Sequence, residues 1–173
     1  AGKKIAIIGA SSFVGQGLFE YFGRLHDGDT VGTFHSHSYP RLELLDVTQE
    51  DQIKGFIQRH HPDVIIYAAA EADAERAEQN PEIAINLNVT APELIKKYFS
   101  GQMIYISTDY VFDGKEPPYK VDSQTHPLDK YGETKRDGET VVLAGEKNLV
   151  VRLGVIFGHR GSSARNFLRQ IVE

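Results

Sequence analysis

The 173-residue sequence contains no cysteine, which excludes disulfides, thiolate metal sites and cysteine nucleophiles. It contains no apolar run of the length that spans a bilayer, and its first residues lead into a predicted strand, with no apolar signal segment before it. Charge of one sign is not in large excess, because the net charge is -5 and the basic residues are scattered. These absences predict a soluble, cytoplasmic protein with neither a membrane nor a nucleic-acid partner.

Apolar residues make up 40% of the chain, which is long enough for one well-buried domain and short for two. Short apolar runs typical of strands alternate with segments of helical spacing. The predicted strands are Lys3 to Gly9, Thr30 to Phe34, a weaker Arg41 to Leu45, Asp63 to Ala70, Gln102 to Ser107 and Asn148 to Phe157. The predicted helices are Phe13 to His26, Gln49 to His61, a long helix from Asn80 to Tyr98, Tyr131 to Leu143 and Ser163 to Val172.

A polar, proline-bearing loop is predicted from Asp113 to Leu128. Strands that alternate with helices predict an α/β fold, a doubly wound parallel sheet of the Rossmann-like kind. Residues 1–173 would form one NAD(P)-binding domain. The carboxyl ends of its strands would share one edge of the sheet, where a binding crevice is expected.

The first strand runs directly into a glycine-bracketed loop, Gly9-Ala10-Ser11-Ser12-Phe13-Val14-Gly15. A pyrophosphate-binding loop needs a tight turn, close backbone approach and a helix N-terminus aimed at the negative charge. Gly9 and Gly15 can supply the tight turn and the helix packing, whereas Ser12 replaces the usual middle glycine and leaves the fingerprint incomplete. Ser11 and Ser12 add hydroxyl donors. The alternative is an ordinary glycine-bracketed turn of an α/β domain.

An acidic residue at the end of the second strand would favour NAD, because it binds the adenosine ribose 2′-hydroxyl. Here the segment Thr33 to Ser38 carries no carboxylate, and Arg41 lies beyond it. NADP is therefore favoured over NAD, with His35 as a candidate contact. The competing interpretation is that His35 and His37 lie on a solvated loop. A His-x-His pair without a third ligand does not indicate a metal site.

Tyr131 is the one tyrosine among eight that is followed by a lysine four residues later, Lys135. On a helix this spacing puts both side chains on one face. A nearby ammonium lowers a tyrosine pKa, which suits proton exchange at a carbonyl or alcohol during hydride transfer. Thr108 follows a predicted strand, where its hydroxyl could bind the substrate oxygen. The alternative is that Thr108 only begins a turn with Asp109.

Several segments together resemble the extended short-chain dehydrogenase/reductases. Within them, the sequence is similar to the dTDP-4-dehydrorhamnose reductase group and to the regulatory β subunit of methionine adenosyltransferase. The segments are Ile106 to Gly114 (ISTDYVFDG), Pro118-Tyr119, Pro127-Leu128, Tyr131 to Lys135 (YGETK), Gly138-Glu139, Ala68 to Glu78, Asn88-Val89 and Asp46-Val47.

The resemblance implies hydride transfer from NAD(P)H to the 4-keto group of a nucleotide-linked deoxysugar. Tyr131 would be the acid, Lys135 would bind the nicotinamide ribose and Thr108 would orient the carbonyl. Asp46 and Val47 would contact the adenine ring, and the segment after the fourth strand, Ala68, Ala69 and Ala70, would line the cofactor.

Members of the group run on for roughly another hundred residues that build most of the sugar site. The resemblance therefore implies that the C-terminal substrate-binding part is absent from this chain. Three functions stay open: a reductase, a non-catalytic NADP-binding regulatory subunit, and a stand-alone nucleotide-binding fold. The expected partners are a nucleotide-sugar substrate and either a second copy in a homodimer or a catalytic subunit. The acidic cluster Glu71, Asp73, Glu75 and Glu78 is interpreted as a solvated helix start, with no metal site.

Overall fold

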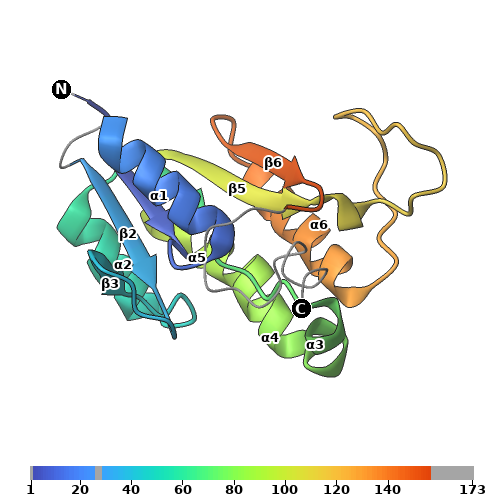
Figure 1. The fold of residues 1–173 in the computed structure, drawn as a ribbon, viewed down its shortest axis with the longest axis horizontal. Coiled ribbons are helices and arrows are strands. Elements are labelled where there is room, and N and C mark those ends of the chain that lie inside the picture. Colours follow the sequence, from blue (N-terminus) through green and yellow to red (C-terminus); the bar gives the residue numbers. More distant parts are fainter. Residues whose placement is uncertain (1, 26–28, 157–173) are drawn as a thin grey trace, which may run out of the picture.

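The structure is a computed structural model that describes residues 2–25 and 29–156, in which six strands form one parallel sheet (Figure 1). The strands are β1 (Ile5–Ile8), β2 (Thr30–Phe34), β3 (Leu42–Leu44), β4 (Val64–Tyr67), β5 (Gln102–Thr108) and β6 (Leu149–Leu153). Their spatial order is β3-β2-β1-β4-β5-β6, and all neighbouring pairs are parallel. This is the strand order of doubly wound dinucleotide-binding domains, so the predicted Rossmann-like fold is confirmed.

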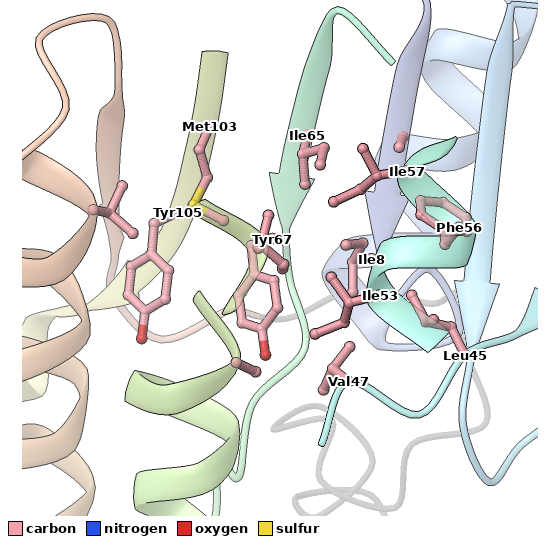
Figure 2. Close-up of a cluster of buried hydrophobic side chains, with 14 residues drawn as sticks. Ile8, Leu45, Val47, Ile53, Phe56, Ile57, Ile65, Tyr67, Met103 and Tyr105 are labelled. Atoms are coloured by element: carbon pink, nitrogen blue, oxygen red, sulfur yellow. The ribbon is translucent and has the colours of Figure 1, made fainter. Parts of the chain in front are cut away.

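Helices cover the sheet on both faces. They are α1 (Phe13–Leu25), α2 (Glu50–His60), α3 (Ala74–Gln79), α4 (Pro81–Ile85), α5 (Ala91–Tyr98) and α6 (Lys130–Leu143), with a π-helical turn η1 (Asn86–Thr90) and a 3₁₀ turn η2 (Asp109–Val111). Side chains of α1 pack on one face of the sheet, and those of α2, α5 and α6 pack on the other (Figures 1 and 2). Because helices cover both faces of the sheet, the central strands β1 and β4 are apolar along their whole length.

Strand β1 shows how this sandwich follows from the sequence. All its residues are buried, since successive side chains point to opposite faces and both faces are covered. Ile5 and Ile7 join the cluster under α1, while Ala6 and Ile8 join the cluster under α2 and α5. Strand β4 is buried in the same way and ends level with β1, because Ile8 pairs with Tyr67.

The long helix predicted from Asn80 contains the π-helical turn η1 between α4 and α5. Two buried tyrosines from neighbouring strands stack beside this turn with ring centroids 5.9 Å apart (Figure 2). The Tyr67 hydroxyl donates to the Leu87 carbonyl (2.7 Å), and the Tyr105 hydroxyl donates to the Asn88 carbonyl (2.8 Å). The π-turn therefore supplies main-chain acceptors to hydroxyls that would otherwise be buried without partners.

The last predicted strand is shorter than expected. Strand β6 ends at Leu153, which pairs with Thr108, the last residue of β5. Beyond Thr108 the neighbouring chain turns into η2, so the ladder has no partner there. Phe157 and the predicted helix Ser163 to Val172 lie outside the described residues.

Candidate functional site

The glycine loop lies at the carboxyl ends of β1 and β4, between which the strand order reverses. Gly9 has φ +85°, and a Cβ there would lie 2.5 Å from the Ala69 nitrogen. The residue must therefore be glycine, because its backbone conformation and the closeness of the next loop both exclude a side chain. The Gly9 amide donates to the Thr33 hydroxyl (3.2 Å), a contact with β2 that sequence reasoning missed.

Ser12 is built into this turn. Its amide donates to the Gly9 carbonyl (3.0 Å), and its hydroxyl accepts from the Gly15 amide (3.1 Å) as an N-terminal cap of α1. A Cβ on Gly15 would lie 2.2 Å from the Gly9 oxygen, so loop and helix are in direct backbone contact. The fingerprint lacks its middle glycine, but the turn is intact. Phe13 and Val14 begin the helix here, where unpaired amides favour an anion.

The predicted adenosine end of the site gathers at the end of β2. The exposed His35 ring nitrogen Nε2 lies 3.9 Å from the Asp46 carboxylate. Burial alone would raise the pKa of Asp46, but hydrogen bonds from Thr48 outweigh it and hold that pKa below its usual value. Val47 is buried in the core beside α2. The structure thus brings His35 and Asp46 together and points Val47 inward.

Thr108 and Tyr131 meet at the carboxyl end of β5. Thr108 is 7% exposed, and its hydroxyl accepts from the Tyr110 amide (3.2 Å). Burial raises the pKa of Tyr131, and the hydrogen bond with the Thr108 side chain only partly offsets this. The Tyr110 ring lies edge-on to Tyr131 with centroids 5.6 Å apart. Tyrosine is protonated at neutral pH in any case, so Tyr131 has a proton to give, but its raised pKa makes it a weaker acid than a tyrosine tuned toward neutral pH.

Lys135 corrects one expectation. Its Nζ donates to the Ile106 carbonyl (2.7 Å) and lies 3.9 Å from the centroid of the Tyr105 ring. Burial lowers the pKa of Lys135 to about 7, against a smaller opposing effect of Glu139. The expected lowering of the Tyr131 pKa by Lys135 is wrong for this structure, where the pKa of Tyr131 is raised. The reason is that burial of Tyr131 itself outweighs the other effects, while the Lys135 ammonium is bound to the Ile106 carbonyl.

The buried lysine makes a testable contribution to stability. An unfolded lysine has its ordinary pKa of 10.5, whereas folded Lys135 has a pKa of about 7. Between these values the unfolded chain binds more protons, so the contribution of Lys135 to the free energy of unfolding rises with pH. We expect urea unfolding to show that the free energy of unfolding of wild type rises relative to that of Lys135→Met between pH 7 and 10, by up to about 1.4 kcal/mol per pH unit. A pH-independent difference would contradict the burial of an uncharged lysine.

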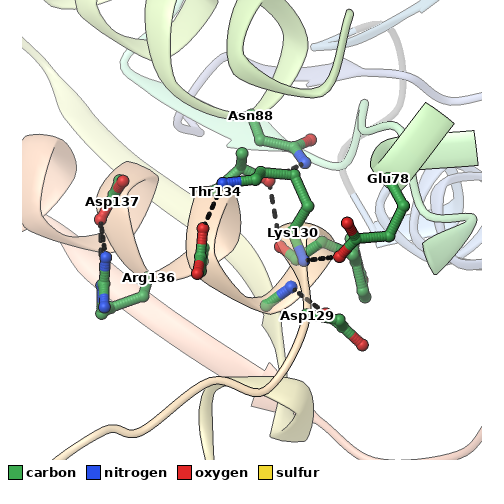
Figure 3. A network of polar contacts seen from close by, with 10 residues as sticks. Glu78, Asn88, Asp129, Lys130, Thr134, Arg136 and Asp137 are labelled. Atoms are coloured by element: carbon green, nitrogen blue, oxygen red, sulfur yellow. Dashed lines mark hydrogen bonds and ion pairs between the residues drawn. The ribbon is translucent and has the colours of Figure 1, made fainter. Parts of the chain in front are cut away.

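The N-terminus of α6, which carries Tyr131, is fixed by polar contacts (Figure 3). The Asp129 carboxylate caps the helix by accepting from the Gly132 amide (2.7 Å), and Glu78 of α3 accepts from the Lys130 amide (2.6 Å). Inside, the fully buried Asn88 donates to the Thr134 hydroxyl (2.9 Å). Helix α6 is therefore tied both to α3 and to the π-turn.

The cap gives a further prediction. Asp129→Ala should lower the free energy of unfolding by about 1 kcal/mol, since it leaves a helix amide without its acceptor. The matched control is Asp122→Ala, at an exposed position of the preceding loop, which should change stability little. Chemical denaturation of both variants measures the difference, and equal stabilities would argue against the cap.

The four residues of the acidic cluster have separate partners. Glu71 is buried and pairs with Arg76 (3.0 Å), and Asp73 caps α3. Glu75 accepts from Gln79, and Glu78 from Lys130. Across residues 2–25 and 29–156, no group of three or more histidine or acidic side chains could hold a metal ion. Nor is any helix in the same residues long and apolar enough to cross a membrane.

Comparison with known proteins places these features in a family. Curated relatives include methionine adenosyltransferase 2 subunit beta of Xenopus laevis, 39% identical over 90% of this chain and 48% of the relative. Another is a probable dTDP-4,6-dihydroxy-2-methyloxan-3-one 4-ketoreductase of Streptomyces antibioticus, 31% identical over 96% of this chain and 55% of the relative. The chain thus spans about half the length of the curated relatives it matches.

Solved structures with a similar fold include proteins of the same kind as the reductase among the sequence relatives. A dTDP-4-dehydrorhamnose reductase of Bacillus anthracis in complex with NADP has a TM-score of 0.87 and 26% identity, covering 99% of this chain and 59% of that one. A hypothetical dTDP-4-dehydrorhamnose reductase of Sulfolobus tokodaii has a TM-score of 0.82 and 32% identity, covering 91% and 58%. The family model described as the RmlD substrate binding domain matches residues 3–173. The chain therefore belongs to the RmlD substrate binding domain family, whose members resemble dTDP-4-dehydrorhamnose reductases.

Proposed function

We propose that residues 1–173 form the NAD(P)-binding domain of a reductase that acts on the 4-keto group of a nucleotide-linked deoxysugar. The observation that carries the proposal is the interaction of Thr108 with Tyr131 at the end of β5, on the same edge of the sheet as the glycine loop and separated from it by β4. The Bacillus anthracis relative in complex with NADP supports the choice of cofactor.

The described residues fit a dinucleotide. Gly9 and Gly15 let the loop pack closely against the segment after β4 and against the start of α1, whose N-terminal amides favour an anion. Ala68, Ala69 and Ala70 follow β4 directly, so small side chains would face the cofactor beside Gly9. The Ser11 and Ser12 hydroxyls would add donors to the pyrophosphate.

NADP is favoured over NAD at the other end of the site. The exposed stretch His35 to Ser38 carries no carboxylate that would repel a 2′-phosphate. Asp46 lies nearby, but it is occupied by Thr48 and faces His35.

The bound cofactor would supply the hydride to the carbonyl carbon. Thr108 would hold the carbonyl oxygen by a hydrogen bond, and Tyr131 would donate its proton to that oxygen as negative charge develops. Tyr131 begins protonated, as tyrosines do at neutral pH, and donation would require its raised pKa to fall once the cofactor and substrate are bound. Lys135 would bind the cofactor ribose only by exchanging the Ile106 carbonyl for a ribose hydroxyl.

Two measurements test the proposal. Calorimetric titration with NADPH and NADH should show binding of both and tighter binding of NADPH. The natural protein that contains this sequence should oxidise NADPH when given a dTDP-4-dehydro-6-deoxysugar. Cofactor binding without turnover of any 4-ketosugar nucleotide would overturn the proposed reductase activity, but the proposed cofactor site would stand.

A regulatory subunit is the second candidate function. Its support is the similarity to methionine adenosyltransferase 2 subunit beta at 39% identity. In that case the same loop would bind NADP, and the protein would assemble with a catalytic adenosyltransferase subunit. Co-purification with such a subunit, mixed at micromolar concentration, tests it. A protein that elutes separately from the subunit would remove this candidate.

A further inference from the structure

A buried ion pair lies behind Lys135. The Glu139 carboxylate is 3% exposed and accepts two hydrogen bonds from Arg152 of β6, from Nε (2.9 Å) and Nη2 (2.6 Å). The Ser107 hydroxyl of β5 donates to the same carboxylate (2.6 Å). Glu139 thus joins α6 to both neighbouring strands through charge-assisted bonds, the stronger kind of hydrogen bond.

The pair is continuous with the residues of the candidate site. Tyr131, Lys135 and Glu139 follow one another at intervals of four on α6, so they lie along one side of the helix. Ser107 immediately precedes Thr108 on β5. Of the two partners of Glu139, Ser107 is therefore next to a residue that the proposed chemistry uses, and Arg152 pairs with Ser107 across the sheet.

Arg152 also contacts the loop between η2 and α6. Its guanidinium carbon lies 5.0 Å from the centroid of the Phe112 ring, and Nη1 donates to the Val121 carbonyl (3.4 Å). Phe112 stacks in turn on Tyr119, with centroids 4.2 Å apart, and the Tyr119 hydroxyl donates to Asp113 (2.7 Å). Arg152, Phe112 and Tyr119 thus form a small stacked cluster. This cluster holds residues 112–121, which we call the 112–121 loop.

This loop is the part of the chain that links the two hydroxyl residues of the site. It leaves β5 after Thr108, and the chain returns to α6 just before Tyr131. The His126 amide donates to the Val111 carbonyl (2.9 Å), which closes the returning segment onto η2. The 112–121 loop is therefore closed at its base between the two residues, and Arg152 fixes its outer part to α6 through Glu139.

We propose that Arg152 and Glu139 are positioning residues of the site, which hold the 112–121 loop against α6 and place the Glu139 carboxylate beside Lys135. Stability alone does not explain the pair, because a buried ion pair often stabilises no more than apolar side chains of equal size. That these residues serve a catalytic site rests on the proposed function, whereas their contacts and the tests of those contacts do not depend on it.

The first test follows the titration of Lys135 by NMR of lysine side chains labelled at Cε. The groups that face its ammonium are Glu139 from α6 and the Tyr105 ring from β5. Glu139→Gln should lower the Lys135 midpoint by about half a pH unit or more, since it removes the one opposing charge. Arg152→Gln should raise the midpoint, because Glu139 loses its other cationic partner. Opposite shifts are the expected result, and shifts of the same sign or of zero would overturn the proposal.

The second test follows the loop by limited trypsin digestion after Lys115 and Lys120, which are exposed. Arg152→Gln should speed this cleavage by about tenfold, as the loop loses its contacts with the guanidinium. Arg152→Lys should speed it as well, because lysine cannot make the forked contact. The matched control is Arg136→Gln on the exposed side of α6, which pairs with Asp137 and should leave the rate unchanged. Equal rates in all variants would overturn the role of Arg152.

A third variant guards against a failure to fold. Glu139→Gln alone leaves Arg152 without a counter-charge, which can unfold the chain. The double variant Glu139→Gln/Arg152→Gln removes both charges, and it should fold, release the loop to trypsin and keep the lowered Lys135 midpoint. A double variant with wild-type cleavage and midpoint would overturn the proposal. Failure to bind NADPH would instead overturn the proposed function, and the two readouts here would still stand.

Discussion

Tyr131→Phe should lower kcat for the 4-ketosugar substrate by about 10² to 10⁴-fold, the usual contribution of a positioned acid. The substitution removes only the hydroxyl that interacts with Thr108 and keeps the ring that packs on Tyr110. The dissociation constant for NADPH should therefore stay close to that of wild type. Steady-state kinetics and calorimetry on the natural protein separate the two effects.

The matched control for this prediction is Tyr21→Phe. Tyr21 is an exposed tyrosine on α1 whose ring lies edge-on to Phe22, away from the strand ends. Loss of its hydroxyl should leave both kcat and NADPH binding unchanged. If Tyr131→Phe retained wild-type kcat, the proton would have to come from another group, and Tyr131 would not be the acid.

Gly15→Ala should lower the free energy of unfolding by about 2 to 4 kcal/mol and abolish NADPH binding. The added Cβ would lie 2.2 Å from the Gly9 oxygen and 2.8 Å from the Ala10 Cα. Both contacts are with backbone, so relief requires α1 to move away from the loop. That movement would open the turn in which Gly9 and Ser12 are hydrogen-bonded.

Gly17→Ala provides the comparison within the same helix. A Cβ on Gly17 would meet nothing within 4 Å, and the residue is exposed. The substitution should raise stability by up to about 1 kcal/mol, because alanine has the better helix propensity. Circular dichroism during urea unfolding measures both variants. Equal stabilities for Gly15→Ala and Gly17→Ala would contradict the close contact between loop and helix.

The fold could be predicted because its signals are local. Strand β1 is a short apolar run that ends at Gly9, and α1 repeats its apolar side chains at helical spacing. The same local signals predicted the parallel arrangement, since strands that alternate with helices require crossovers. The π-turn η1 could not be predicted, because its acceptors serve Tyr67 and Tyr105, which reach it from other strands.

The candidate site was partly predictable for the same reason. Spacing alone put Tyr131 and Lys135 on one helix, and strand ends put Thr108 near them. The surroundings of Lys135 depend on tertiary contacts with the Ile106 carbonyl and the Tyr105 ring. The raised pKa of Tyr131 likewise depends on its burial, which only the tertiary structure shows.

Arg152 donates to one carbonyl, that of Val121, but its main partner is Glu139. The two residues are 13 apart in sequence on different elements. No local pattern links them, since the contact exists only once β6 has packed beside α6.

Isotope transfer tests the central claim most directly. The natural protein containing this sequence would be incubated with NADPH deuterated at the transferable position and a dTDP-4-dehydro-6-deoxysugar, and the sugar product analysed by mass spectrometry. Hydride transfer beside Thr108 and Tyr131 predicts a product that carries deuterium at C4, and no such product from Tyr131→Phe at the same time point. Product without deuterium, or bound NADPH with no product at all, would contradict the reductase.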